Sequence, residues 1–173
     1  MAKTSNLREF QETILNRLKE VSATTGAASG SRLAVMVGSQ RLLIDLVDVV
    51  EVLPVPPVLA VPHTQPWFLG VANVRGNLYN ISDLVQFAGL PPQPRTANNR
   101  ILLLNSDEST QSALVITSLI GLRNIQEMEL KAVSDAQQQV FGHNFYEDAE
   151  KNQWVVFDVD ALVKSPAFIQ PNA

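Results

Sequence analysis

Residues Gly70 to Leu84 read GVANVRGNLYNISDL and contain the signals of a complete structural unit. Apolar and polar residues mix on both sides of Arg75-Gly76, which is typical of two strands joined by a tight turn where Gly76 takes a positive φ. Asp83 then precedes an apolar stretch, where a carboxylate can cap the first turn of a helix. The stretch therefore predicts a β-hairpin that leads into a short helical turn.

A second segment, His143 to Leu162, repeats this order of signals. It contains a strand pattern, a polar turn at Glu147–Asn152, another strand pattern and then Asp158 before an apolar stretch. Two copies of one barrel unit would produce such an echo. We therefore expect the chain to contain two related β units.

Short apolar or alternating runs bounded by Gly, Pro, Asn or Ser continue along the chain and bring the total to about ten expected strands. They are Leu33–Val37, Leu42–Ile44, Val49–Leu53, Trp67–Val74, Leu78–Ile81, Ile101–Leu104, Ala113–Thr117, Leu122–Ile125, Val140–Tyr146 and Trp154–Phe157. This density of short strands is typical of a sandwich or barrel. The proline-rich segment Leu90–Asn99 lies near the middle of the series and predicts a seam between two sub-barrels.

The N-terminal residues 1–31 are predicted to form an amphipathic helix followed by a flexible tether. Asn6 can cap the helix, with Glu9 three residues later. An apolar stripe follows at helical spacing: Leu7, Phe10, Ile14, Leu18 and Val21. The stripe fits a helix docked on its own protein or one that binds a partner, and the spacing leaves both readings open.

Composition limits the classes of function. With 46% hydrophobic and 17% charged residues, the 173-residue chain can bury a substantial core. A net charge of -4 without a Lys/Arg cluster disfavours nucleic acid as a partner. The chain contains no cysteine, no run near the ~20 apolar residues that span a bilayer, and no signal-peptide pattern at its start. We therefore expect a soluble, cytoplasmic protein that does not insert into a membrane.

No pattern in the sequence predicts catalysis. His63 and His143 are far apart and lack carboxylates at ligand spacing, so neither a metal site nor a cofactor is expected. No phosphate-binding glycine loop or nucleophile motif occurs. Asp158 and Asp160 could form a carboxylate pair, but a capping role accounts for Asp158. The sequence thus predicts a protein that is not an enzyme.

Arg75 is the candidate functional residue of the hairpin. It could be a solvated residue at the tip of a turn. It could instead present five N–H donors in a planar fork to a carboxylate or to carbonyl groups of a partner. The spacing alone does not separate these readings.

The string formed by Gly70-Val71, Asn73, Arg75-Gly76, Ile81 and Asp83-Leu84 resembles the signature of the CheW-type coupling proteins of bacterial chemotaxis. Further similarity lies at Ile44–Val52, Trp67–Gly70, Ile101–Leu104 and Val155–Asp158. The resemblance covers residues 32–164. Residues Leu7–Gln11 and Arg17-Leu18 are more similar to the coupling proteins of twitching-motility systems.

The resemblance implies a mainly β fold of two five-stranded SH3-like barrels on one core, spanning residues 32–164, with 165–173 as a C-terminal tail. It implies a non-catalytic adaptor between a methyl-accepting chemoreceptor and the regulatory domain of a CheA-type histidine kinase. The residues it points to for receptor contact are Val49, Glu51 and Arg75, whereas no kinase-contact residue can be assigned.

Two segments depart from the family pattern, Asn77–Asn80 and Thr117-Ser118, and the first adjoins the expected receptor surface. The alternative function is a small β-barrel nucleic-acid-binding or translation-associated module, which the acidic balance disfavours.

Overall fold

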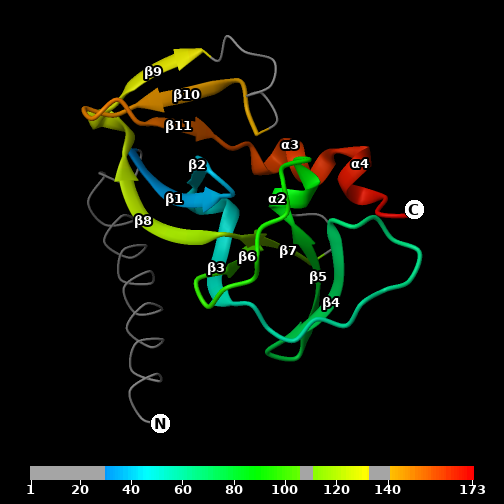
Figure 1. Ribbon diagram of the computed structural model, residues 1–173. Coiled ribbons are helices and arrows are strands. Elements are labelled where there is room, and N and C mark those ends of the chain that lie inside the picture. The colour runs from blue at the N-terminus through cyan, green and yellow to red at the C-terminus, as the bar shows by residue number, and fades with distance from the viewer. Residues whose placement is uncertain (1–29, 106–110, 133–140) are drawn as a thin grey trace.

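The computed structural model describes residues 30–105, 111–132 and 141–173 (Figure 1). The predicted N-terminal helix lies outside these residues. The strands are β1 (Ser31–Val37), β2 (Gln40–Asp45), β3 (Val49–Pro54), β4 (Phe68–Val74), β5 (Asn77–Asp83), β6 (Arg100–Leu104), β7 (Ser112–Ile116), β8 (Ser118–Asn124), β9 (Glu129–Ala132), β10 (Asn144–Glu147) and β11 (Gln153–Val156). The short helices are η2 (Leu46–Asp48), α2 (Leu84–Phe87), η3 (Ile125–Glu127), α3 (Val159–Lys164) and α4 (Pro166–Ile169). Within the described residues, no helix has the length and apolarity needed to cross a membrane.

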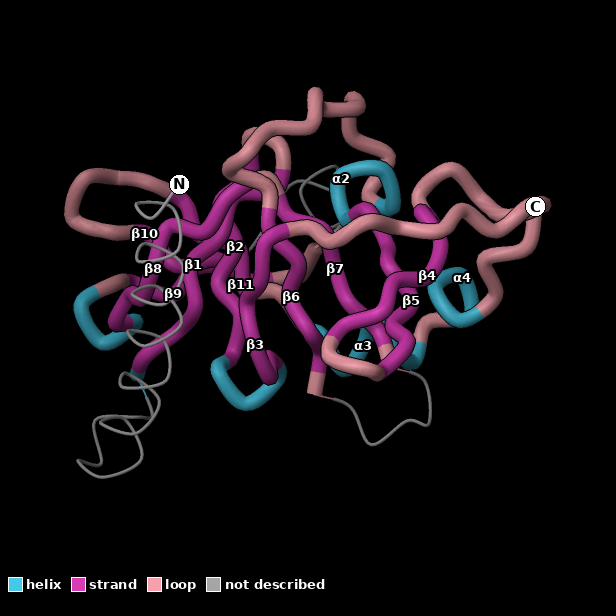
Figure 2. Tube along the Cα trace, turned by 90° about the horizontal axis from the view of Figure 1, so that it is seen from below, coloured by secondary structure: helices cyan, strands magenta, loops and turns pink. Residues whose placement is uncertain are grey.

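The strands form two sheets, which confirms the expected mainly β fold. The first barrel is the five-stranded sheet with the order β3-β6-β7-β5-β4. The second barrel is the six-stranded sheet with the order β8-β1-β2-β11-β10-β9. Figure 2 shows the two sheets side by side, with β4 and β5 at one end of the molecule and β8 to β10 at the other.

The seam expected at residues 90–99 is wrong, because this segment connects β5 and α2 to β6, which belongs to the same sheet as β5. The chain instead passes between sheets at η2, after β2, and at Thr117, between β7 and β8. A proline-rich composition indicates a loop but contains no information about which sheet the next strand joins. Each barrel is therefore completed by a hairpin from the other half of the chain.

The internal echo of the sequence corresponds to a structural repeat. In the first barrel, β5 and β7 are parallel. The other neighbouring strands of that sheet, β3 with β6, β6 with β7, and β5 with β4, are antiparallel. In the second barrel, β2 and β11 are parallel. The other corresponding pairs, β8 with β1, β1 with β2, and β11 with β10, are antiparallel. A register shift lies between Val49 and Glu51 of β3, and β8 carries one where it pairs with Ala34 and Val35 of β1. The two barrels are thus equivalent in pairing and in the place of their edge-strand bulge.

The second barrel has one strand more than expected, β9. Among the described strands, β9 pairs with β10 alone, and it reads Glu-Leu-Lys-Ala, with three of its four residues exposed. An exposed edge strand needs no apolar alternation, so the sequence pattern did not reveal it. Two strands begin at residues other than those predicted. β8 begins at Ser118 rather than near Leu122, and β10 begins at Asn144 rather than near Val140.

Among the described residues, the core consists of three apolar clusters. Each barrel encloses its own cluster, seven buried residues in the first and three in the second. The largest cluster lies between the barrels and takes residues from both sheets and from α2, α3 and α4. In β6, for example, Leu102 and Leu104 face this shared cluster while Ile101 and Leu103 face the first barrel. Strands that bury both faces are apolar throughout, which explains runs such as ILLL.

The two predicted caps are confirmed. Asp83 accepts a hydrogen bond from the backbone N–H of Gln86 at the start of α2. Asp158 accepts one from the backbone N–H of Ala161 at the start of α3. Both short helices lie at the junction of the barrels, where Leu84 and Leu162 enter the shared cluster (Figure 1).

The last residues of the chain pack on the first barrel. Phe168 of α4 is buried and stacks on Trp67, with the ring centroids 5.8 Å apart. Phe87 meets both rings edge to face. Beyond α4, the backbone N–H of Gln65 donates to the carbonyl of Pro171, which ties the segment to the loop before β4.

Candidate functional site

The feature that joins two of the three predicted contact residues is an ion pair between Glu51 and Arg75. The Nη2 and Nη1 atoms of Arg75 lie 2.7 and 2.8 Å from the two carboxylate oxygens of Glu51. Glu51 belongs to β3 and Arg75 follows β4, and these two strands are the opposite edges of the first sheet. The bidentate pair therefore links the two ends of the sheet across the mouth of the first barrel.

Arg75 is held at its position by the turn that the sequence predicted. Arg75 and Gly76 form a two-residue connection with φ values of 52° and 86°. Positive φ at both positions is the geometry of a type I′ turn, which favours Asn, Asp or Gly. Asn73 closes the turn by accepting a hydrogen bond from the backbone N–H of Gly76 at 2.8 Å. A long side chain in the left-handed region costs about 1 kcal/mol or more, so the turn presents Arg75 from a strained backbone.

The bulge in β3 sets the direction of Glu51 and of its neighbours. Val49 pairs with Leu104 and is 2% exposed, so its side chain belongs to the shared core. Val50 occupies the bulge and is 50% exposed. The structure thus brings Glu51 and Arg75 together at the surface. Val49, the third residue predicted for receptor contact, is instead buried in the core and anchors β3 from inside.

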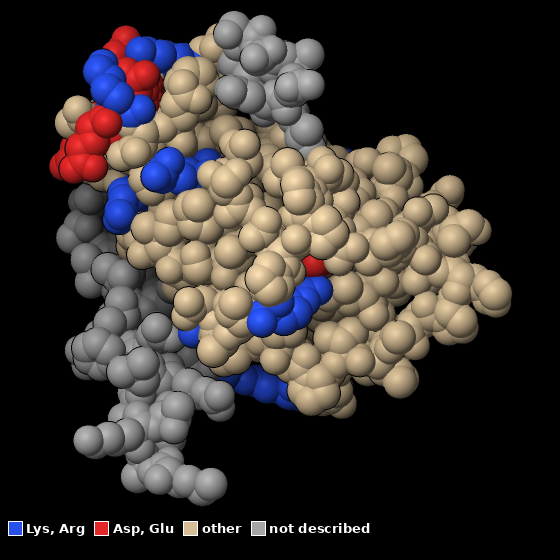
Figure 3. All heavy atoms as spheres, in the orientation of Figure 1, with Lys and Arg blue, Asp and Glu red and all other residues tan. Residues whose placement is uncertain are grey.

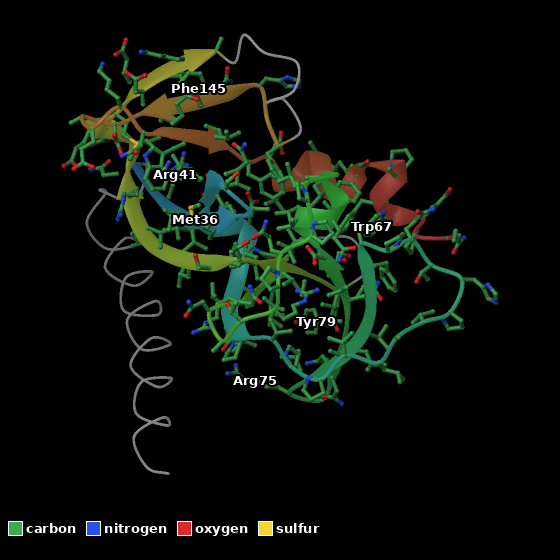
Figure 4. All side chains as sticks on the ribbon, viewed as in Figure 1. Met36, Arg41, Trp67, Arg75, Tyr79 and Phe145 are labelled. Atoms are coloured by element: carbon green, nitrogen blue, oxygen red, sulfur yellow. The ribbon has the colours of Figure 1, made fainter. Side chains whose placement is uncertain are left out.

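Exposed apolar side chains lie on the strands and loop around this pair. Val50 precedes Glu51, and Leu78 follows the turn at 64% exposure. Further along β4, the proline-rich loop that pairs with Val71 exposes Leu59, which is 72% exposed. Figure 4 shows Arg75 at the outer end of the hairpin, at the opposite end of β4 from Trp67. An arginine beside exposed apolar side chains is a combination that is frequent at protein-binding surfaces.

The loop that carries Leu59 is fixed against β4 by its backbone. Leu59 and Val71 exchange two backbone hydrogen bonds of 2.8 and 2.9 Å. Gly70 makes this approach possible, because a Cβ atom there would lie 2.0 Å from the carbonyl oxygen of Leu59. Gly70, the first glycine of the signature string, therefore positions the proline-rich loop against β4 rather than the turn itself.

Sequence reasoning missed that Glu51 and Arg75 are partners of each other. The two residues had been expected to meet a partner separately. The available signal was a lone acidic residue in one apolar strand and a lone basic residue in another turn, which are the residue types that pair across a sheet. Within the described ranges, no group of three or more His, Asp or Glu side chains could hold a metal ion.

Two equivalent small barrels packed on a shared core define a mainly β protein of the double SH3-like kind, with a charged pair at one barrel mouth. The chain belongs to the CheW-like domain family, whose sequence profile matches residues 32–167.

Individual relatives agree with this assignment. The chain is 27% identical over 144 residues to the protein PilI of Pseudomonas aeruginosa, which covers 82% of this chain and 79% of PilI. A probable chemotaxis protein CheW of Rhizobium etli is 32% identical over 71 residues, 41% of this chain and 46% of that protein. The crystal structure of the scaffolding protein TtCheW from Thermoanaerobacter tengcongensis has the same fold, with a TM-score of 0.67 at 16% identity over 79% of this chain and 94% of that one.

Proposed function

We propose that the chain is a non-catalytic adaptor that couples a methyl-accepting chemoreceptor to a CheA-type histidine kinase, in chemotaxis or in type IV pilus twitching motility. The similarity to PilI over most of the chain supports the twitching-motility branch. The observation that carries the proposal is the surface ion pair between Glu51 of β3 and Arg75 of the β4–β5 hairpin, which carries the family's signature string. In this proposal, the pair and the apolar side chains beside it contact the cytoplasmic tip of the receptor.

The geometry of the pair suits a docking contact. Glu51 is 20% exposed and Arg75 is 63% exposed, so the carboxylate lies at the barrel mouth and the guanidinium faces outward. The carboxylate holds the guanidinium in one orientation before a partner arrives, which lowers the entropy lost on binding. Val50 and Leu78 supply apolar area beside it.

The roles of other carboxylates support a protein without catalysis. Asp83 accepts hydrogen bonds from Gln86 and from Arg95, and Asp158 caps α3. Both carboxylates are therefore engaged in helix capping, and Asp83 is also engaged in an ion pair with Arg95. We expect the purified protein neither to hydrolyse ATP nor to accept phosphate from an active histidine kinase.

The experiment measures calorimetric binding of the purified chain to a receptor cytoplasmic fragment and to the kinase regulatory domain of the same organism. Arg75→Ala is expected to weaken receptor binding by about 2–4 kcal/mol, because acceptors on the partner stay buried and unpaired. Arg75→Lys should restore the affinity only partly, since lysine lacks the planar fork. Glu51→Lys should also weaken receptor binding while the barrel stays folded.

The matched control is Lys164→Ala, which removes an exposed ion pair with Asp160 on α3. This variant should bind the receptor like the unmodified chain. Failure of the unmodified chain to bind either partner would refute the adaptor function. Unchanged receptor affinity of folded Arg75→Ala would refute the site.

A further inference from the structure

The segment where the chain passes from the second sheet to the first presents an apolar surface. This η2 surface consists of Leu46 and Val47 of η2 and Val50 and Val52 of β3. Val47 is 69% exposed and Val50 is 50% exposed, while Leu46 and Val52 are half-buried against the shared cluster. Val50 directly precedes Glu51. The η2 surface therefore adjoins the receptor site of the proposed function.

The chain enters the described domain beside this surface. β1 begins at Ser31, and its next residue, Arg32, lies opposite Asp45, the residue directly before η2. Arg32 and Asp45 also form an ion pair of 3.7 Å. Val47 follows Asp45 by two residues. Residues 1–29 are therefore attached to the domain next to the η2 surface.

The sequence before β1 contains an apolar stripe that suits this surface. The stripe runs from Leu7 to Val21, which corresponds to about 21 Å at the rise of an α-helix. An isolated helix of only about 15 residues is marginal in water, so it needs a surface on which its apolar face can pack. Nine residues separate Val21 from Ser31, and they extend over at most about 30 Å. The stripe can therefore reach the η2 surface from its point of attachment.

The charges of the two parts are complementary. Burial raises the pKa of Asp48, Arg32 lowers it in part, and three neighbouring carboxylates raise it further: Asp45, Asp158 and Asp160. The η2 surface thus lies in a region of negative potential. Arg17 borders the predicted stripe, because it follows Ile14 by three residues and Phe10 by seven. The acidic residues of the same segment fall on the opposite side of a helical projection: Glu9, Glu12 and Glu20.

We propose that residues 7–21 of this chain dock their apolar stripe on the η2 surface and so cover the edge of the receptor site. The tether favours this occupant over a second copy of the chain, because a short flexible linker gives an effective concentration in the millimolar range. Receptor binding must then displace the docked segment, which makes the segment an internal competitor. This regulatory step rests on the proposed function, whereas the docking does not.

The docking is tested by disulfide formation in the full chain, which has no natural cysteine. Ile14→Cys is combined with Val47→Cys, and oxidised glutathione is the oxidant. Docking holds the two thiols close enough to bond. This pair should therefore form an intramolecular disulfide at least about tenfold faster than a control pair, Ile14→Cys with Leu130→Cys.

Leu130 is the matched control because it is exposed to a similar degree and is also near the attachment point. Its exposed fraction is 57%, and it lies on β9, which follows η3. The cap of η3, Asn124, lies opposite Ser31. Charged side chains of both signs gather at this end of the molecule (Figure 3). Equal rates for the two pairs, or disulfide-linked dimers in place of linked monomers, would overturn the docking.

The regulatory step is tested by receptor affinity. Phe10→Asp places a charge in the stripe and should tighten binding to the receptor fragment by at least about fivefold, because the docked population no longer competes. Glu12→Ala, on the opposite side of the predicted helix, should leave the affinity unchanged. Equal or weaker receptor binding by Phe10→Asp would overturn the competition. An unmodified chain that binds no receptor would overturn the adaptor function and the competition together, while the disulfide rates would still decide the docking.

Discussion

Glu51 and Arg75 form a bidentate ion pair that connects the two edge strands of the first barrel, with contacts of 2.7 and 2.8 Å. The arginine adopts a φ of 52°, in the region that glycine or asparagine usually occupies. The side chain that closes the barrel is therefore presented from a strained backbone. The ion pair is partly exposed, and such pairs stabilise a fold by about 0–1 kcal/mol. Its contribution to stability is small beside its value for orienting a binding group.

The weak ion pair and the strained backbone at Arg75 together predict how two substitutions at this position change stability. Arg75→Ala should lower the free energy of unfolding by no more than about 1 kcal/mol, because only the exposed pair is lost. Arg75→Gly should be more stable than Arg75→Ala by roughly 1 kcal/mol, since glycine adopts positive φ without steric cost. Urea denaturation monitored by circular dichroism measures both. Greater stability of the alanine variant would contradict the assigned turn geometry.

Gly70 should tolerate a side chain far less well than Gly76. A Cβ at Gly70 would lie 2.0 Å from the Leu59 carbonyl oxygen, whereas one at Gly76 meets nothing within 4 Å. Gly70→Ala should therefore cost about 3 kcal/mol or more, because the loop must leave β4. Gly76→Ala is the control and should cost roughly 1 kcal/mol through its positive φ alone. Equal destabilisation of the two variants, measured as the shift in Tm, would rule out the close contact between Leu59 and Gly70.

The fixed carboxylate of Asp148 should make stability depend on pH in the acid range. Its pKa in the folded protein is lowered from 3.8 to about 2, mainly by the Trp154 hydrogen bond. A lowered pKa stabilises the fold above the unfolded value and loses this contribution as pH falls toward the folded value. The Tm of the unmodified chain should thus fall between about pH 4 and about pH 2 more steeply than that of Asp148→Asn. Parallel Tm profiles would contradict the assignment. Glu147, whose pKa is also lowered, chiefly by its hydrogen bond to Lys151, is present in both proteins and cancels in the comparison.

The C-terminal helix should contribute to stability as part of the domain. Phe168 is 8% exposed and packs on Trp67 and Phe87. Phe168→Ala should cost about 3 kcal/mol through the lost burial and the cavity that remains. Ile169→Ala is the control, because this neighbour is 59% exposed and should change stability by less than about 0.5 kcal/mol. Denaturant titration of both variants tests whether residues 165–173 behave as a tail or as part of the core.

Local features of the structure could be predicted from the sequence because their causes lie within a few residues. The positive φ at Gly76 follows from a two-residue connection between strands. The caps at Asp83 and Asp158 follow from a carboxylate placed before a helical turn. The repeat of the strand-turn-strand-cap order predicted two related units, and the pairing of the two sheets confirms this relation.

The pairing of the strands could not be predicted from the sequence, because it depends on contacts between distant parts of the chain. Alternation shows that Leu102 and Ile101 face opposite sides, but both sides of β6 are buried, so the pattern cannot assign either face to a barrel. The prediction placed the seam at residues 90–99 because this segment is proline-rich, and that composition does not show which sheet the next strand joins. Only the pairing of β1 and β2 with β8 and β11 shows that the hairpins are exchanged between the halves.

The sequence by itself determined which residues are candidates for partner contact: an arginine at a turn and a glutamate and a valine in an apolar strand. The tertiary structure alone decided which of them meet. Glu51 pairs with Arg75 because sheet order places β3 and β4 at opposite edges of one curved sheet. A bulge of one residue at Val50 places Glu51, rather than Val50, opposite Leu103 of β6. Arg41 and Arg123 meet over Trp154 because β2 and β8 both join the second barrel. Strand pairing joins residues far apart in the chain, and a one-residue shift in register changes the face of every side chain that follows.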